Sequence, residues 1–291
     1  MIINIGSINI DHVYKVINLP KPGETTASIG YETFLGGKGV NQSVAIARAS
    51  GKVRHVGAVG HDGDWALRQM EALGVSTADI AMLPTATGHA VIALDQAGEN
   101  QILIEAGANQ KLTESQITRA FTQHKSNADW VLLQNETNLA EFIVREAKAF
   151  GYKVAYAAAP FVADVTIKLL PHIDLLAVNE VEASALAGEL GGLLEEISVP
   201  MVLVTLGSKG SVVYAGDDVI GQDAFSVDVV DTVGAGDTFL GSFLARFANN
   251  QSLKASLRYA AAASALQITK FGAATTIPER AEVDAFLERE Q

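Results

Sequence analysis

The chain has 291 residues, of which 48% are hydrophobic and 19% are charged, and it contains no cysteine. This composition supports a sizeable folded core, and the lack of cysteine excludes disulfides, thiolate catalysis and cysteine-ligated zinc. A formal net charge of −12 argues against a nucleic acid or an anionic membrane as a partner.

The N-terminal segment MIINIGSINID is apolar but is interrupted by Asn4, Asn9 and Asp11. It has no basic region, so we expect a first strand and not a signal peptide. No apolar stretch approaches the length of a membrane-spanning helix. The six histidines are scattered, without the spacing of a metal site. These features predict a soluble cytoplasmic protein.

Further along the chain, apolar bursts alternate with helical patterns. We expect a helix from about Lys38 to Ser50, ended by Gly51. DGDWALRQMEALG predicts a second helix, with an acidic N-cap and with Gly74 as its C′ glycine. Short buried strands are then expected at DWVLLQ, KVAYAAA, DLLAVN and MVLVTLG. This alternation predicts an α/β protein with a mostly parallel sheet that helices cover on both faces.

Residues 12–35 and 88–106 break this rhythm, because they alternate without helices between them. HAVIALDQAGENQILIEAG predicts a hairpin that turns at about residues 97–100. One interpretation is an antiparallel extension at the edge of the main sheet. The other, which we adopt, is a small separate β-sheet that covers the site as a lid on a single domain of residues 1–291.

Near the C-terminus, VDTVGAGDTFLGSF (residues 230–243) follows FSVDVV, which predicts a strand. Its glycines differ from a dinucleotide fingerprint, because Phe239 takes the place of the last glycine and no acid lies near Ala255. A Walker A loop is absent from the sequence. What remains is a glycine turn that opens a helix near residues 235–237, and such a helix start can bind an anion.

An aspartate within this turn allows two interpretations. Asp237 could cap the start of the helix. Alternatively, its carboxylate could accept a proton from a hydroxyl group while the backbone N–H groups of Gly234, Ala235 and Gly236 stabilise the group being transferred. That second arrangement suits phosphoryl transfer, in which positioning and charge neutralisation do most of the catalytic work.

The segment DTVGAGDTFLGSF resembles the C-terminal signature of the ribokinase-like (pfkB-type) carbohydrate kinases. Four other segments resemble motifs of that family in the same order: GSINIDH (6–12), GGKGVNQ (36–42), NEVEA (179–183) and TLGSKG (205–210). The resemblance covers nearly the whole chain. It implies a three-layer α/β/α fold with a β-lid, and an ATP-dependent sugar kinase that transfers the γ-phosphate to a primary hydroxyl.

For the sugar, two side chains on one strand face, Asn9 and Asp11, could grip vicinal hydroxyls or could cap the strand end. The resemblance implies that the sugar is bound by Asn9, Asp11, Gly37, Lys38, Asn41 and Glu136, although a solvated role for Lys38 is equally open. This set is similar to that of ribokinases, which implies the 5-hydroxyl of ribose as acceptor. Another pentose or hexose stays open, as does a nucleoside. Its base would need an apolar or aromatic pocket, to which Tyr14, Tyr31 and Phe34 could belong, or these three could simply pack the lid.

For the nucleotide, Asn179 and Glu182 lie three positions apart at a helix start, which suits a capping box and also a water-mediated Mg²⁺ site. The resemblance implies nucleotide contacts from Asn179, Thr205, Gly207, Ser208 and Gly210. It also implies a monovalent cation, K⁺, held by Asp231, Thr232 and Thr276.

The sequence departs from the family pattern in two places. Residues 157–160 are Ala-Ala-Ala-Pro where many members have Asn-Pro-Ala-Pro, and the stretch Gly188–Val199 is short. The missing Asn keeps open a non-catalytic regulator that binds a sugar or nucleotide. Exposed strands in a lid are an edge liability, and together with the resemblance they predict a homodimer formed through the lids.

Overall fold

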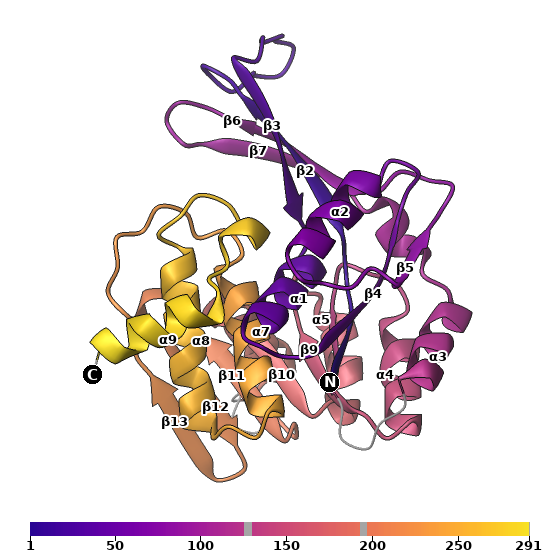
Figure 1. Cartoon of the computed structure of the whole chain (residues 1–291), viewed down its shortest axis with the longest axis vertical. Helices are drawn as coiled ribbons and strands as arrows, with labels where there is room; N and C mark the ends of the chain where they lie inside the picture. The colour runs from indigo at the N-terminus through magenta and orange to yellow at the C-terminus, as the bar shows by residue number, and fades with distance from the viewer. Residues whose placement is uncertain (125–129, 193–196, 291) are drawn as a thin grey trace.

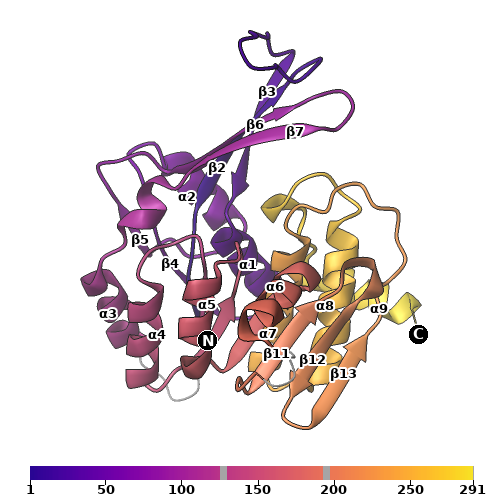
Figure 2. The same cartoon turned by 180° about the vertical axis from the view of Figure 1, so that it is seen from behind.

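The computed structural model describes residues 1–124, 130–192 and 197–290. Within these residues the chain forms a nine-stranded sheet and a separate four-stranded sheet. Figure 1 shows the small sheet projecting from a larger body of strands and helices, and Figure 2 shows the same arrangement from behind.

The large sheet is parallel except at one edge. Its strands are, in spatial order, β13 (Asp218–Gln222), β12 (Ser211–Ala215), β11 (Met201–Thr205), β10 (Leu175–Asn179), β9 (Lys153–Ala157), β8 (Trp130–Gln134), β1 (Ile2–Ile5), β4 (Val53–Val59) and β5 (Asp79–Met82). Among the described strand pairs of this sheet, β11–β12 and β12–β13 are antiparallel and the others are parallel. Strand β1, which lies between β8 and β4, is buried along its whole length, as expected of a parallel strand covered on both faces. The mostly parallel sheet is therefore confirmed.

Helices cover both faces of this sheet. Residues of α3 (Glu114–Gln123), α4 (Ala140–Ala149), α5 (Ala163–Leu169) and α6 (Glu180–Leu190) pack in the core of one face. Residues of α1 (Lys38–Arg48), α7 (Ala235–Ala248), α8 (Leu253–Gln267) and α9 (Arg280–Arg289) pack in the core of the other. A third cluster joins α2 (Asp64–Ala72) to α1 and to β4. The three-layer prediction is confirmed, and none of the described helices is long and apolar enough to cross a membrane.

The helices α1 and α7 approach each other closely. A Cβ atom added to Gly241 would lie 2.6 Å from both the Ala45 Cβ and the Gln42 carbonyl oxygen. Only a glycine therefore allows this contact, which brings the second turn of α7 against the second turn of α1.

The small sheet has the strand order β3 (Gly30–Gly36), β2 (Asn9–Lys15), β6 (Gly88–Leu94) and β7 (Asn100–Glu105). Strands β6 and β7 form the expected hairpin, whose turn is held by the Asp95 carboxylate as it accepts N–H bonds from Ala97 (2.9 Å) and Glu99 (3.0 Å). Because this sheet is separate, the alternative of an extended main sheet is wrong.

Two local expectations are also wrong. No strand forms at residues 225–230, where the backbone is irregular. Helix α2 has Gly63 as its N-cap, without a side-chain cap, because the Asp62 carboxylate instead accepts bonds from the backbone N–H and the hydroxyl of Thr87 (2.8 and 2.7 Å). The expected C′ residue, Gly74, does have a positive φ of 83°.

The short stretch 188–199 lies partly outside the described residues, since 193–196 are not described.

Candidate active site

A cavity of about 240 Å³ opens at the carboxyl ends of β9, β10 and β11, beside the start of α7. This is the edge of an open parallel sheet where ligands bind. Of the predicted site residues, the cavity is lined by Lys38, Asn179, Glu182, Thr205, Thr232 and the turn Gly234–Asp237. Segments far apart in the sequence therefore meet at one site.

The glycine turn opens α7 as expected. Gly234 is the N-cap with a φ of 77°, and no side chain caps the helix. Within the described residues, the backbone N–H groups of Gly236 and Asp237 bond to no acceptor. A Cβ atom added to Gly236 would meet nothing within 4 Å. The helix start is thus open to an anionic ligand.

The Asp237 carboxylate does not cap the helix, so that interpretation is wrong. Its Oδ2 accepts a hydrogen bond from Asn41 Nδ2 (3.0 Å), and its Oδ1 accepts one from Gln42 Nε2 (2.9 Å). The residue is only 8% exposed. Burial raises the pKa of this carboxyl group, while nearby Lys38 and the two amides oppose the rise. The result is a desolvated carboxylate, held by two donors, at the wall of the cavity.

The orientation of Gln42 is itself fixed by buried amides. Gln134 Nε2 donates to Gln42 Oε1 (2.7 Å) and to Asn4 Oδ1 (2.9 Å). Asn4 Nδ2 in turn donates to the hydroxyl of Ser43 (2.8 Å). Because Gln42 Oε1 accepts the bond from Gln134, the N–H₂ group of Gln42 is the end of the amide that points to Asp237. Sequence reasoning missed Gln42 and Gln134, although Gln42 belongs to the GGKGVNQ motif.

Two further carboxylates belong to this region, since Glu136 lies close enough to affect the charge of both Asp237 and Asp11. Glu136, just after β8, accepts bonds from the Ser7 hydroxyl (2.5 Å) and from the Lys38 backbone N–H (3.0 Å). Burial raises the pKa of Asp11 to about 6, and the negative charge of Glu136 adds to the rise. Carboxylates grouped in this way are acceptors suited to a neutral ligand that carries several hydroxyl groups.

Two glycines leave space for the side chains on β2. A Cβ atom at Gly36 would lie 2.1 Å from Asp11 Oδ2, and one at Gly88 would lie 2.5 Å from Asn9 Oδ1. Asn9 Oδ1 accepts a bond from Asn109 Nδ2 (2.7 Å). Asn9 and Asp11 share one face of β2, as expected from a period of two. The sequence alone did not reveal Gly88 and Asn109, because both contact Asn9 on β2, which is distant from them in the sequence.

Two residues of the glycine-rich motif are also explained by the structure. Gly37 has a φ of 94°, and a Cβ atom there would lie 3.0 Å from the Ser7 carbonyl oxygen. Asn41 Oδ1 is buried and has no hydrogen-bond partner within the described residues. Since a buried acceptor without a partner is costly, this atom fits a donor from a ligand.

The predicted base contacts of a nucleoside do not all lie near Asp11. Tyr14 and Tyr31 pack against each other, with ring centroids 4.8 Å apart. Counting along β2 by twos places Tyr14 on the face opposite Asp11. Phe34 pairs with Asp11 across the two strands and so shares its face, and its ring lies edge-on to Phe271 at 6.0 Å.

At the start of α6, Asn179 and Glu182 form the expected capping box. Asn179 Oδ1 accepts from the N–H groups of Val181 and Glu182, and Glu182 Oε2 accepts from the Asn179 N–H, all at 2.9 Å. Glu182 Oε1 makes no hydrogen bond within the described residues. In the described part of the chain no group of three His, Cys, Asp or Glu could hold a metal. One free carboxylate oxygen at a cavity fits Mg²⁺ that is bound mainly by water and phosphate.

The remaining predicted nucleotide residues lie beyond Thr205, in the turn between β11 and β12. Gly207, Ser208 and Gly210 are not part of the cavity wall. Gly210 has a φ of 99°, and a Cβ atom there would lie 2.1 Å from the Gln222 carbonyl oxygen. This glycine is therefore required by the fold of the hairpin itself.

The residues predicted to hold K⁺ join two loops, 231–234 and 271–276. Asp231 accepts N–H bonds from Val233 and Gly272, both at 3.0 Å. The Thr276 hydroxyl contacts the carbonyl oxygen of Gly272 at 2.6 Å. Between the loops lies the side chain of Gln267, whose amide nitrogen already bonds to oxygens of both. These residues do not fit a bound monovalent cation.

Comparison with known proteins agrees with this geometry. Residues 1–280 match the family model described as pfkB family carbohydrate kinase. A ribokinase from Haemophilus influenzae is 34% identical over 299 residues, which cover 98% of this chain and 97% of that protein. Among solved structures, a ribokinase from Thermotoga maritima has a TM-score of 0.88 at 33% identity, with 99% of each chain covered.

A ribokinase from Arabidopsis thaliana, solved with ribose and ATP, has a TM-score of 0.85 at 32% identity and covers 99% of this chain and 98% of its own. The fold, the order of the motifs and the arrangement of the cavity lead to the same conclusion. The protein belongs to the pfkB family of carbohydrate kinases.

Proposed function

We propose that the protein transfers the γ-phosphate of ATP to the 5-hydroxyl of ribose. The observation that carries this proposal is Asp237, a buried carboxylate in the first turn of a helix whose start is open, close to Lys38 and to the carboxylate of Glu136. The related ribokinases cited above support ribose as the substrate.

In this mechanism the sugar lies between the small sheet and the large one. Its hydroxyls contact Asn9, Asp11, Gly37, Lys38, Asn41 and Glu136. The primary hydroxyl points to Asp237, which accepts its proton as the oxygen attacks the γ-phosphorus atom. The open N–H groups of the turn Gly234–Asp237 bind the oxygens of the transferred phosphoryl group, on which charge accumulates.

The nucleotide occupies the cavity beside α6 and α7. Asn179 and Thr205 would contact it from the cavity wall, and Gly207, Ser208 and Gly210 from the turn beyond. Mg²⁺, when bound near Glu182 through water, supplies charge neutralisation for the phosphates. Lys38 also lines the cavity, and its ammonium group would offset the charge of the phosphates.

We further propose that the small sheet, about residues 12–35 and 88–106, acts as a lid. Closing it over the sugar would exclude water, which could otherwise accept the phosphoryl group. Its outer strand β7 is exposed along its whole length, and this supports a homodimer formed through the lids.

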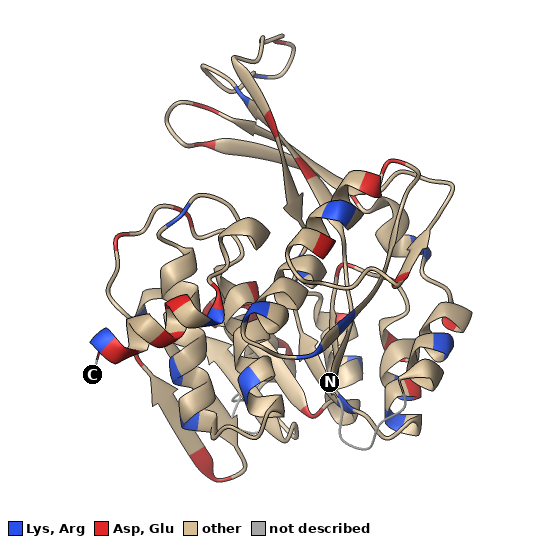
Figure 3. Ribbon diagram, in the orientation of Figure 1, with Lys and Arg blue, Asp and Glu red and all other residues tan. Residues whose placement is uncertain are grey.

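Other partners are not expected. The net charge is −12, and in Figure 3 the Lys and Arg residues are dispersed along the ribbon and do not form a basic stripe. This supports a cytoplasmic enzyme of small molecules without a nucleic-acid partner. Ala157 and Ala159 give only methyl groups to the cavity wall, but Asp237 and the carboxylate of Glu182 also line it, which favours a kinase over a regulator.

The test is ATP-dependent phosphorylation by the purified protein across ribose, 2-deoxyribose, hexoses and nucleosides, with Mg²⁺ present. We expect the highest kcat/KM for ribose. Asp237→Asn should lower kcat by about 10²- to 10⁴-fold, while the affinity for ribose, measured by calorimetry, stays close to that of the wild type. Turnover of Asp237→Asn near the wild-type rate would show that another group is the base. Turnover of a nucleoside in place of ribose would support the kinase activity but would show that ribose is not the substrate.

A further inference from the structure

The side chain of Gln267, the last residue of α8, is completely buried between two loops next to the active site. Its Nε2 donates to the carbonyl oxygen of Val233 (2.7 Å) and to that of Gly272 (3.1 Å). The Thr276 hydroxyl oxygen lies 3.5 Å from the same nitrogen. Three oxygens from the two loops therefore surround one amide nitrogen.

The orientation of this amide is determined by its neighbours. Carbonyl oxygens can only accept hydrogen bonds, so they require the N–H₂ group and not the oxygen of the glutamine. The Gln267 Oε1 atom is buried without a partner within the described residues. The unpaired Oε1 is thus the consequence of an orientation in which the Nε2 donor lies between the two loops.

The oxygens around Gln267 are also the ones that a metal ion at this position would use. A ring of carbonyl oxygens can replace the hydration shell of a monovalent cation. Here Gly272 O accepts from Gln267 and also from the Thr276 hydroxyl, so both of its lone pairs are engaged. Each Asp231 carboxylate oxygen also accepts one N–H bond, from Val233 or from Gly272. An ion would have to displace the glutamine.

The loops that Gln267 joins control the open start of α7. Val233 directly precedes the N-cap Gly234, and the Ala235 N–H bonds to the Thr232 carbonyl oxygen (3.2 Å). The end of α8 is tied to the same loop, because the Ile268 carbonyl oxygen accepts the N–H groups of Val230 (2.8 Å) and Asp231 (3.1 Å). Fixing Val233 thus fixes the N–H groups that would bind the phosphoryl group.

We propose that the amide of Gln267 takes the place of a monovalent cation between loops 231–234 and 271–276, so that the phosphate-binding turn is held without K⁺. The proposal rests on the kinase function given above, but its structural part can be tested without turnover. Gln267 is a positioning residue in this scheme, because it reaches the phosphoryl group only through the backbone of the turn.

The first test is the wild-type enzyme in KCl, NaCl or tetramethylammonium chloride at equal ionic strength. We expect kcat to agree within about twofold across the three salts, and the melting temperature to be the same in each. Activation of the wild type by K⁺ of tenfold or more would overturn the proposal, whatever the variants do.

The second test uses two variants that differ only in the space they leave. Gln267→Ala removes the donor and opens a cavity lined by oxygens, so it should lose at least tenfold in kcat in tetramethylammonium and regain much of it in KCl. Its melting temperature should rise with KCl. Gln267→Met removes the donor but fills the space, so it should lose activity without rescue by K⁺. Full activity of Gln267→Met, or no K⁺ response of Gln267→Ala in either readout, would contradict the role of the amide.

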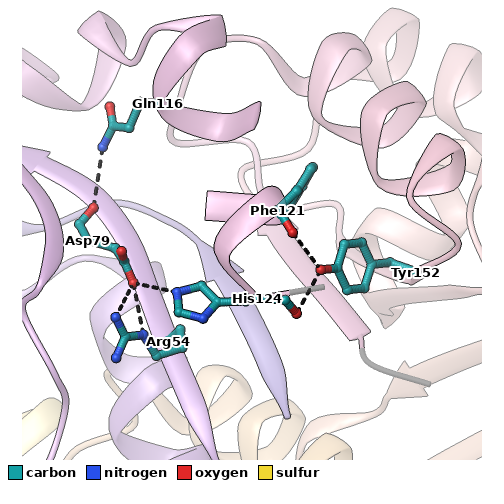
Figure 4. A network of polar contacts seen from close by, with 6 residues as sticks. All are labelled: Arg54, Asp79, Gln116, Phe121, His124 and Tyr152. Atoms are coloured by element: carbon teal, nitrogen blue, oxygen red, sulfur yellow. Dashed lines mark hydrogen bonds and ion pairs between the residues drawn. The ribbon is translucent and has the colours of Figure 1, made fainter. Parts of the chain in front are cut away.

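The chain offers a matched control in Gln116, a second buried glutamine whose Nε2 donates to carbonyl oxygens, those of Gly57 (2.7 Å) and Asp79 (3.4 Å). Figure 4 shows its bond to Asp79, whose carboxylate is held by Arg54 and His124. Gln116→Ala should lower the melting temperature equally in all three salts. If no sugar is turned over but Gln267→Ala still gains a K⁺-dependent melting temperature, the proposed function fails and the inference stands.

Discussion

Asp11 places a carboxylate where water is largely excluded, and this position costs stability. Burial, with Glu136 nearby, raises its pKa from 3.8 to about 6. The folded protein therefore binds a proton more tightly than the unfolded chain, so stability falls as the pH rises from about 4 to about 6. The cost is present in full at neutral pH and absent below the unfolded pKa.

Asp11→Asn should therefore stabilise the fold while weakening the sugar site. A shift of this size corresponds to roughly 3 kcal/mol, an upper bound because a buried Asn amide also gives up hydrogen bonds to water. We expect chemical denaturation to show a gain of about 1–3 kcal/mol at pH 7.5 and almost none at pH 3.5. An equal gain at both pH values would mean that the carboxylate charge is not its source.

Gln42 should control the pH at which Asp237 is ionised. Burial already raises the pKa of Asp237, and the Gln42 donor opposes this rise. Hydrogen bonds to charged groups contribute about 1.5–3 kcal/mol, so Gln42→Met should move the acidic limb of kcat/KM upward by about one pH unit. Gln116→Met serves as the control that loses a buried amide elsewhere. If Gln42→Met lowers the stability but leaves the acidic limb of kcat/KM at the same pH, Gln42 contributes to packing and not to the pKa of Asp237.

At the scale of secondary structure, strand β3 carries two glycines that make different contacts. A Cβ atom at Gly36 would overlap the Asp11 carboxylate, whereas one at Gly30 would lie 3.5 Å from Lys15 Cδ, an ordinary contact. Because the Asp11 carboxylate can rotate away, Gly36→Ala should fold but should raise KM for the sugar about tenfold or more.

Gly30→Ala is the control on the same strand, and it should leave KM unchanged. Steady-state kinetics of both variants, with their melting temperatures, decide the matter. Equal KM values for the two variants would remove Asp11 from the sugar site.

Most elements were predictable because their signals are local. Buried parallel strands are continuous apolar runs, and α7 starts at a glycine turn that the sequence shows directly. The segment 225–230 was predicted as a strand but does not form one. Its alternating pattern is still visible in the burial, because Phe225 and Val227 are half-buried. A strand needs a neighbour, and here the backbone of Val230 bonds to the end of α8 at Ile268 (2.8 Å).

In the candidate site, only the residues that belong to a sequence motif could be predicted. Asp11 and Asp237 lie in motifs that the sequence shows, and in the structure both lie close enough to Glu136 for its charge to affect them. The amides that orient Asp237 and fill the space between the loops, Gln134 and Gln267, lie outside the motifs. Their roles depend on partners in other elements, which a single sequence does not reveal.

At the scale of the whole molecule, the small sheet leaves strand β7 without cover. Leu103 is 75% exposed and Ile104 is 73% exposed, and successive residues of a strand point to opposite faces. If two lids pair, sedimentation equilibrium should give twice the mass of the chain. Leu103→Lys or Ile104→Lys should shift it toward the monomer.

The control is Val219→Lys on β13, the edge strand of the large sheet, where the side chain is 64% exposed. This change should leave the mass unaltered. If Val219→Lys dissociates the dimer and the β7 variants do not, the dimer interface lies at the large sheet and not at the lid.

The close contact between α1 and α7 also sets the order in which the active site can come together. Gln42 meets Gly241, yet about two hundred residues separate them in the chain. During synthesis the sugar-binding segments leave the ribosome early, and the turn with Asp237 leaves when most of the 291 residues have been made. A partly made chain therefore displays a surface for sugar but lacks both the proton acceptor and the phosphate-binding turn, so it has no means of consuming ATP until the last helices pack.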